Sequence, residues 1–301
     1  SIIKMRKLQL SVLSGLLLAF SWPEIGFFVC IFFAFLPLFI LENVISISNS
    51  KRKRLEVFFY AFVSFLIFNV ITTYWVCNAT LYGGVAAFLI NSLLMSIVFL
   101  LYHLVKETLT KRLAVLFFIL CWIGMEYLHL NWKLAWPWLV LGNVFSNNPA
   151  LVQWYEYTGF LGGSLWVLLI NIMFFNLINF SNKLINLVMI AVYVITPISI
   201  SLLIYSQIYR NSEENLNIVI VQPNIDPYTE KFNIGYKSQL DQFIAISKEK
   251  LTQSTDLLVG PETALLEPLW ENNIDNSYSI NSFRKLQKEY PKLNILIGSS
   301  K

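Results

Sequence analysis

The strongest constraint on this fold is a set of long apolar stretches that carry almost no charge. From Val57 to Val105 the chain contains no Asp, Glu, Lys or Arg. Charged residues make up 13% of the 301 residues, which is about half the share usual in soluble domains. Helices of soluble proteins have a polar face, and these stretches lack one. The sequence therefore predicts a polytopic helical bundle in a lipid bilayer.

We expect about seven membrane segments before residue 210. Two of them, Leu55–Val76 and Val85–Val105, are long enough to cross a hydrocarbon core of about 30 Å. The shorter segments can be oblique, or covered by their neighbours. The other five segments are Leu8–Trp22, Ile25–Leu41, Leu113–Tyr127, Gly162–Phe180 and Leu184–Ile204.

The distribution of Lys and Arg predicts the orientation of the bundle. One set of segment ends holds eleven of them: Lys4, Arg6, Lys7, the four residues 51–54, Lys106, Lys111, Arg112 and Lys183. The alternate ends hold only Lys133 and Arg210. Loops rich in Lys and Arg stay in the cytoplasm. The residues after Arg210 are therefore expected on the side away from the cytoplasm.

The composition changes near residue 210, where we place a domain boundary. Residues 1–210 form the expected transmembrane helical domain, and residues 211–301 have the composition of a soluble domain. Short apolar runs that end at Pro or Gly predict strands, and apolar residues at helical spacing predict helices. The expected strands are Leu216–Gln222, Asp256–Gly260 and Leu293–Ser300, with helices from about Tyr236 to Leu251 and over Ser282–Glu289. This alternation predicts a layered α/β fold.

Glu262 is the candidate catalytic residue of the second domain. It follows the second expected strand, two residues after Gly260, and Pro261 fixes the turn between them. Reactive groups gather where the strands of an α/β sheet end. The alternative is an acid at a helix N-terminus that interacts with main-chain amides.

A loop rich in Trp and Tyr, His129–Leu161, lies on the expected outer side of the bundle. It contains Trp136, Trp138, Trp154 and Tyr155. These residues are either an aromatic belt at headgroup level or a surface that binds lipid substrates. Glu126 and Glu156 border the loop, and we expect water to reach both and neither to be catalytic.

No metal site or cofactor is expected. Cys30, Cys77 and Cys121 lie in or beside apolar segments, without a C-x-x-C pair or a neighbouring His. His103 and His129 are isolated in the sequence. We expect the cysteines to serve as small apolar residues.

Three stretches carry a resemblance to a known family. They are "GLLLAFSWPEIGFFVCIFFAFLPLFI", "WPWLVLGNVFSNNPALVQWYEYTGFLGGSLWVLLIN", and "VQPNIDPYTEKF" followed by "DLLVGPETAL". Together they resemble the apolipoprotein N-acyltransferases, bacterial membrane enzymes with a nitrilase-type (carbon–nitrogen hydrolase) domain. The chain departs from the family at Gly260, where a bulky aromatic residue often precedes the proline.

The resemblance implies a site, substrates and a location. Residues 211–301 would be the first part of a periplasmic nitrilase-like α/β sandwich, and the protein a multi-pass component of the bacterial inner membrane. Glu262 would be the general base for a cysteine that takes an acyl group from a phospholipid and passes it to a diacylated apolipoprotein. Phe232 falls near an aromatic position at the lipid entrance of the family, and the alternative is a core residue at the start of the first helix of this domain. We expect a monomer without a nucleic-acid partner.

The resemblance also implies that the chain is an N-terminal fragment. The family's nucleophilic cysteine and oxyanion-binding lysine would lie past Lys301, so the fragment alone is expected to be inactive. Two alternatives stay open. One is a membrane-anchored nitrilase-type amidase, and the other is a non-catalytic membrane protein with a degenerate nitrilase domain.

Overall fold

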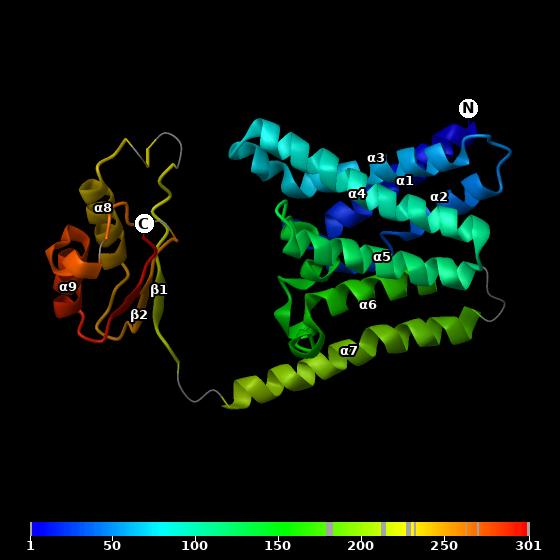
Figure 1. Ribbon diagram of the computed structural model, residues 1–301. Helices are drawn as coiled ribbons and strands as arrows, with labels where there is room; N and C mark the ends of the chain where they lie inside the picture. Colours follow the sequence, from blue (N-terminus) through cyan, green and yellow to red (C-terminus); the bar gives the residue numbers. More distant parts are fainter. Residues whose placement is uncertain are drawn as a thin grey trace. The chain divides into compact units, whose positions relative to one another are not determined.

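The computed structural model describes residues 2–178, 183–211, 215–226, 230–231, 233–262, 264–269 and 271–299. The chain divides into two compact units, Ser1–Arg210 and Asn211–Lys301 (Figure 1). The described part of the first unit is built from helices, and the second unit combines a small parallel sheet with helices.

The first unit contains the predicted bundle. Its described α-helices are α1 (Ile2–Ser21), α2 (Leu36–Ser46), α3 (Lys53–Thr73), α4 (Leu81–Thr108), α5 (Lys111–Asn131), α6 (Tyr155–Leu177) and α7 (Lys183–Asn211). Short 3₁₀ helices lie between them: η1 (Phe28–Phe32), η2 (Tyr74–Asn78), η3 (Pro137–Leu139), η4 (Leu141–Phe145) and η5 (Pro149–Leu151). Threonine side chains cap the N-termini of α4 and α5. Thr80 Oγ1 accepts a hydrogen bond from Gly83 N, and Thr110 Oγ1 accepts one from Leu113 N.

Six described stretches are long and apolar enough to cross a membrane. They are Phe28–Ser46, Lys53–Asn78, Leu81–Thr108, Lys111–Asn131, Tyr155–Leu177 and Lys183–Gln207. These stretches correspond to the second through seventh expected segments. The first expected segment lies in α1 and is not one of these six described stretches. Any 18 consecutive residues of α1 include the three charged residues Lys4, Arg6 and Lys7. The later part of α1 still belongs to the bundle, where Leu18 is fully buried.

The second expected segment is not one continuous helix. It is broken between η1 and α2, and the side chain of Asn171 on α6 fills the break. Asn171 Oδ1 accepts from Phe35 N at 2.9 Å, and Asn171 Nδ2 donates to Ile31 O at 2.8 Å. The main-chain groups freed by the break are thereby hydrogen-bonded, as a low-dielectric surrounding requires.

Aromatic rings fill the core of the bundle beside this break. Phe35, Phe65, Phe118 and Trp122 are fully buried. Phe35 meets Trp122 edge-to-face, with ring centroids 4.9 Å apart and planes at 89°. Such edge-to-face pairs stabilise packing beyond the area that they bury.

A buried polar cluster joins α2 to α4 at the end of the bundle that carries the basic loops. Glu42 is fully buried, its Oε1 lies 2.7 Å from His103 Nδ1, and its Oε2 accepts from Lys106 Nζ. Lys106 Nζ also donates to Asn43 Oδ1 at 2.6 Å. His103, isolated in the sequence, therefore has a structural partner. A buried carboxylate is tolerated when it is paired in this way.

The second unit contains a parallel sheet in the order β1 (Ile218–Ile220), β2 (Leu257–Val259), β3 (Asn294–Leu296). Leu258 pairs with Val219 on one side and with Ile295 on the other. Helix α8 (Tyr236–Lys248) connects β1 to β2, and η6 (Glu271–Asn276) and α9 (Tyr278–Glu289) connect β2 to β3. The predicted alternation of strands and helices is confirmed, and each strand, at three residues, is shorter than predicted.

Among the described residues of the second unit, helices cover one face of this sheet and leave the other uncovered. Helices α8 and α9 pack on the covered face (Figure 1), where Leu258 is fully buried against Phe243 and Leu286. Side chains alternate between the two faces of a strand. The opposite face presents Ile220 and Leu296, which are 76% and 63% exposed.

Candidate active site

Main-chain hydrogen bonds hold the segment that follows β2 along the continuation of β3. Gly260 N donates to Leu296 O at 2.9 Å, and Gly298 N donates to Pro261 O at 3.0 Å. Leu265 N then donates to Gly298 O at 3.1 Å. The turn that carries Glu262 is therefore fixed on both sides.

Two glycines permit this close approach. A Cβ atom at Gly298 would lie 1.5 Å from the main-chain oxygen of Glu262, so no larger residue fits there. A Cβ atom at Gly260 would lie 2.8 Å from Ile297 Cγ1 and 3.0 Å from Phe243 Cζ. An aromatic residue before Pro261 would therefore have to displace these two side chains.

Glu262 lies in a turn at the carboxyl end of the central strand, and its side chain is exposed. In the described part of the chain, the next helix after Glu262 is η6, which begins at Glu271. The alternative in which Glu262 is an acid at a helix N-terminus is therefore wrong. The placement at a strand end is the one that the sequence predicts.

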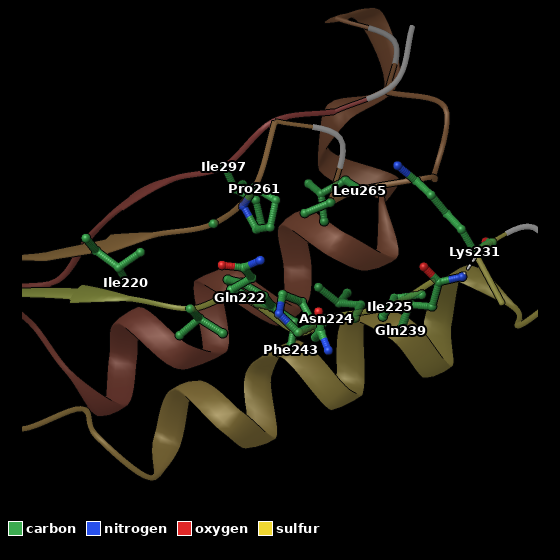
Figure 2. Close-up of a pocket in the computed structure, with 15 residues that line it drawn as sticks. Ile220, Gln222, Asn224, Ile225, Lys231, Gln239, Phe243, Pro261, Leu265 and Ile297 are labelled. Carbon is green, nitrogen blue, oxygen red and sulfur yellow. Dashed lines mark hydrogen bonds between the residues drawn. The ribbon is translucent and has the colours of Figure 1, made fainter. Parts of the chain in front are cut away.

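A cavity of about 460 Å³ opens beside this turn, between the carboxyl ends of the strands and α8. Figure 2 shows Pro261 and Leu265 on one side of it and Phe243 on the other. Its polar lining residues are Gln222, Asn224, Lys231 and Gln239. The cavity therefore combines apolar walls with a few polar groups, as small-molecule sites do.

Two of these polar residues have a distinctive geometry. Asn224 has a φ of 56°, in the left-handed region that Asn tolerates better than most residues. Gln239 Nε2 donates to the main-chain oxygens of Lys231 and Ile234, at 2.6 and 2.8 Å (Figure 2 draws the first bond). These bonds fix the loop between β1 and α8 over the cavity.

Sequence reasoning did not select the polar residues of this cavity. A signal for Gln222 and Asn224 was present, because both follow β1 directly, at the same sheet edge as Glu262. Lys231 and Gln239 gave no such signal. Gln239 lies on α8, and Lys231 reaches the cavity because the loop after β1 folds back onto this helix.

A second carboxylate near this turn, Glu267, caps α9. Its oxygens accept from Ser277 Oγ at 2.9 Å, Tyr278 N at 3.0 Å and Ser279 N at 2.8 Å. Partial burial favours the protonated acid, but the hydrogen bonds from Ser279, Ser277 and Tyr278 outweigh it and lower the pKa of Glu267. Its role is structural.

The predicted lipid-contacting residues fall into different environments. Trp138 is 52% exposed and meets the ring of Trp75 edge-to-face at 5.4 Å. Trp136 lines a cavity in the first unit. Trp154 and Tyr155 pack against the bundle core, and Tyr155 Oη donates to Gly142 O at 3.0 Å. Phe232 lies outside the described residues.

The expectation that water reaches Glu126 is wrong. Its side chain is 2% exposed, because the chain after α5 folds back over it. Glu126 Oε1 accepts from Trp122 Nε1 at 3.0 Å and from Leu141 N at 2.9 Å. Glu156 is exposed, as predicted.

The cysteines all belong to the first unit, where each is half-buried and free. In the described ranges, no three His, Cys, Asp or Glu side chains gather as a metal site would require. Residues 211–301 contain no cysteine.

Comparisons with known proteins extend over both units. Residues 14–173 match the family model of the apolipoprotein N-acyltransferase N-terminal domain. An apolipoprotein N-acyltransferase of Chlorobaculum tepidum is 27% identical over 291 residues, covering 92% of this chain and 52% of that protein. One of Geobacter metallireducens is 26% identical over 284 residues, covering 86% and 51%. The chain therefore spans about half the length of the curated relatives it matches, and it belongs to the apolipoprotein N-acyltransferase family.

Proposed function

We propose that the protein transfers a fatty acyl group from a membrane phospholipid to the N-terminal diacylglyceryl-cysteine of apolipoproteins. Glu262 acts as the general base. The nucleophilic cysteine and the oxyanion-binding lysine come from the half of the protein that this chain does not span. The 301 residues alone are then inactive. Family membership supports the reaction class, and the position of Glu262 supports its role.

The proposed reaction has two steps. Glu262 takes the proton of the cysteine thiol, and the thiolate attacks the ester carbonyl of the phospholipid. A thioester forms, and the lysophospholipid leaves with the proton. The α-amine of the acceptor then attacks the thioester, an amide bond forms, and the thiol is regenerated. The lysine stabilises the negative charge that develops on the carbonyl oxygen in both steps.

The observation that carries this proposal is the rigid placement of an exposed carboxylate at the end of the central strand. The hydrogen bonds of Gly260, Gly298 and Leu265 fix the main chain around Glu262. Its side chain is exposed, so a reactive group can approach it. A general base must be held within hydrogen-bond reach of the proton that it removes, and a fixed turn meets this need.

The uncovered sheet face supports a nitrilase-like sandwich as the complete second domain. Ile218, Ile220 and Leu296 are apolar and largely exposed on that face. Exposed apolar surface of this kind fits a second layer that packs against it. We propose that residues 211–301 supply the first sheet of this sandwich, and that it lies on the periplasmic side of the inner membrane.

For the lipid substrates, we propose contacts with the aromatic residues Trp136, Trp138, Trp154, Tyr155 and Phe232. Rings with a polar edge suit the level at which acyl chains meet headgroups. The exposed ring of Trp138 offers the most accessible surface of the described four.

The experiment is thioester capture in the complete protein. Membranes are incubated with a phospholipid that carries an alkyne-labelled acyl chain, and the label on the protein is quantified before and after hydroxylamine. Glu262→Gln should lower the thioester label about 100-fold or more, because a general base contributes at least that factor. Glu249→Gln is the matched control, since Glu249 is exposed at the end of α8. Undiminished label in Glu262→Gln would refute the role of Glu262.

A further inference from the structure

The first unit contains a second cavity, of about 220 Å³, between the start of α4 and the end of α5. These helix ends are opposite to those that carry Lys106 and Lys111. Helix α4 contributes its small side chains at helical spacing, and the loop after α5 closes the other side. The lining residues are Gly83, Ala86, Ala87, Ile90, Asn91, His129, Trp132, Leu134, Ala135 and Trp136.

Polar atoms without partners concentrate around this cavity. Among the described residues, ten buried side-chain N and O atoms have no hydrogen-bond partner, and five of them belong to its lining. They are Asn91 Oδ1, both ring nitrogens of His129, Trp132 Nε1 and Trp136 Nε1. Asn91 and His129 are only 3% and 5% exposed. Buried polar atoms are costly without partners, so their grouping around one cavity indicates a bound polar group.

The residues that carry these atoms are held in place. Trp136 N donates to His129 O at 3.0 Å, and the His129 ring meets the Trp132 ring edge-to-face at 5.4 Å. On the other wall, Asn91 Nδ2 donates to Asn69 Oδ1 at 2.6 Å. These contacts hold the lining residues in place on both sides of the cavity.

The hydrogen-bonding character of these five atoms determines which ligand the cavity can bind. The two indoles only donate, and a neutral imidazole donates through one nitrogen and accepts through the other. The ligand must therefore offer several acceptor oxygens close together. A neighbouring small cavity shares Asn91, His129 and Trp136 with this one.

We propose that this cavity binds the phosphodiester headgroup of a bilayer phospholipid. Trp132 Nε1, Trp136 Nε1 and His129 donate to its phosphate and ester oxygens, and Asn91 Oδ1 accepts from a donor of the headgroup. The proposal deepens the proposed function, on which it rests for the choice of a phospholipid. Its test measures binding and needs no transfer, so failure here leaves the thioester experiment informative.

The test is a titration of the protein labelled with ¹⁵N at its indoles, in maltoside micelles without phospholipid. Dihexanoylphosphatidylethanolamine is added, whose ammonium group supplies the donor for Asn91 Oδ1. The Nε1–H resonances of Trp132 and Trp136 are identified from the variants that lack each indole. Both resonances should shift with one dissociation constant. Trp136→Phe keeps an aromatic ring but removes the donor, and it should weaken binding about tenfold, as loss of a hydrogen bond to a charged group does.

Trp75→Phe is the matched control, because Trp75 lies outside the cavity lining. It should leave the dissociation constant unchanged. Trp132→Phe provides a second variant, and unchanged resonances of the remaining indoles before lipid addition show that each variant is folded. Inorganic phosphate and dihexanoylglycerol are titrated separately, and neither should shift the two resonances.

Equal shifts with inorganic phosphate would overturn the assignment to a lipid. Shifts with dihexanoylglycerol would overturn the assignment to a phosphodiester. No shift with any of the three compounds, or equal affinity in Trp136→Phe and Trp75→Phe, would show that the cavity holds only water.

Discussion

Replacing Asn171 by Leu should destabilise the first unit by about 1–3 kcal/mol. The amide of Asn171 makes two hydrogen bonds to the break between η1 and α2, to Phe35 N and Ile31 O. A third bond, to Val167 O, stays within its own helix. Side-chain hydrogen bonds between membrane helices contribute about 0.6 kcal/mol on average and up to about 1.7 kcal/mol. Two such bonds give the stated range, and Leu keeps most of the volume.

The free energy of unfolding is measured by titrating the protein in maltoside micelles with dodecyl sulfate and following tryptophan fluorescence. Asn131→Leu is the matched control, because Asn131 is exposed and its amide donates to Tyr127 O of the same helix. It should stay within about 0.5 kcal/mol of the unaltered protein. A loss in Asn171→Leu that is no larger than in this control would refute the view that Asn171 holds the break.

Two further predictions concern the second unit. Glu267→Gln should cost about 1 kcal/mol of stability at neutral pH, since Gln keeps one acceptor oxygen for the start of α9. The pKa of Glu267 is lowered on folding, so its contribution is complete above the ordinary value of 4.5 and disappears as the pH falls through the lowered pKa. Thermal unfolding of both proteins against pH checks this, and a difference that persists in strong acid would contradict it. Gly298→Ala should displace the turn at Glu262 and lower the thioester label in the complete protein, because the added methyl group overlaps the Glu262 main chain. Gly235→Ala, where a methyl group meets nothing within 4 Å, is its control, and equal labelling of the two would contradict the packing argument.

The elements that depend on local pattern could be predicted from the sequence. Length and apolarity locate Leu81–Thr108 as a membrane helix, because a bilayer requires both. The strand Leu257–Val259 follows from a short apolar run that ends at Gly260-Pro261. Glu262 follows Gly260 by two residues, so the predicted strand also places Glu262 at the end of the central strand.

Features that depend on distant partners could not be predicted. The break before α2 requires Asn171, which lies 136 residues from Phe35. Glu126 is buried because the main chain at Leu141 returns to it. His129 gave no functional signal in the sequence, since its surroundings include Asn91 of another helix.

The most direct test of the account is the side of the membrane on which the second unit lies. Glu249→Cys and Arg52→Cys each place a thiol at an exposed position, one in the second unit and one in a basic loop of the bundle. Intact bacterial cells that produce either variant are treated with a membrane-impermeant maleimide, and the parent protein gives the background of Cys30, Cys77 and Cys121. The account predicts that position 249 is labelled in intact cells and position 52 only after permeabilisation. The reverse pattern would place Glu262 in the cytoplasm and contradict a base that serves lipoprotein acylation on the periplasmic side.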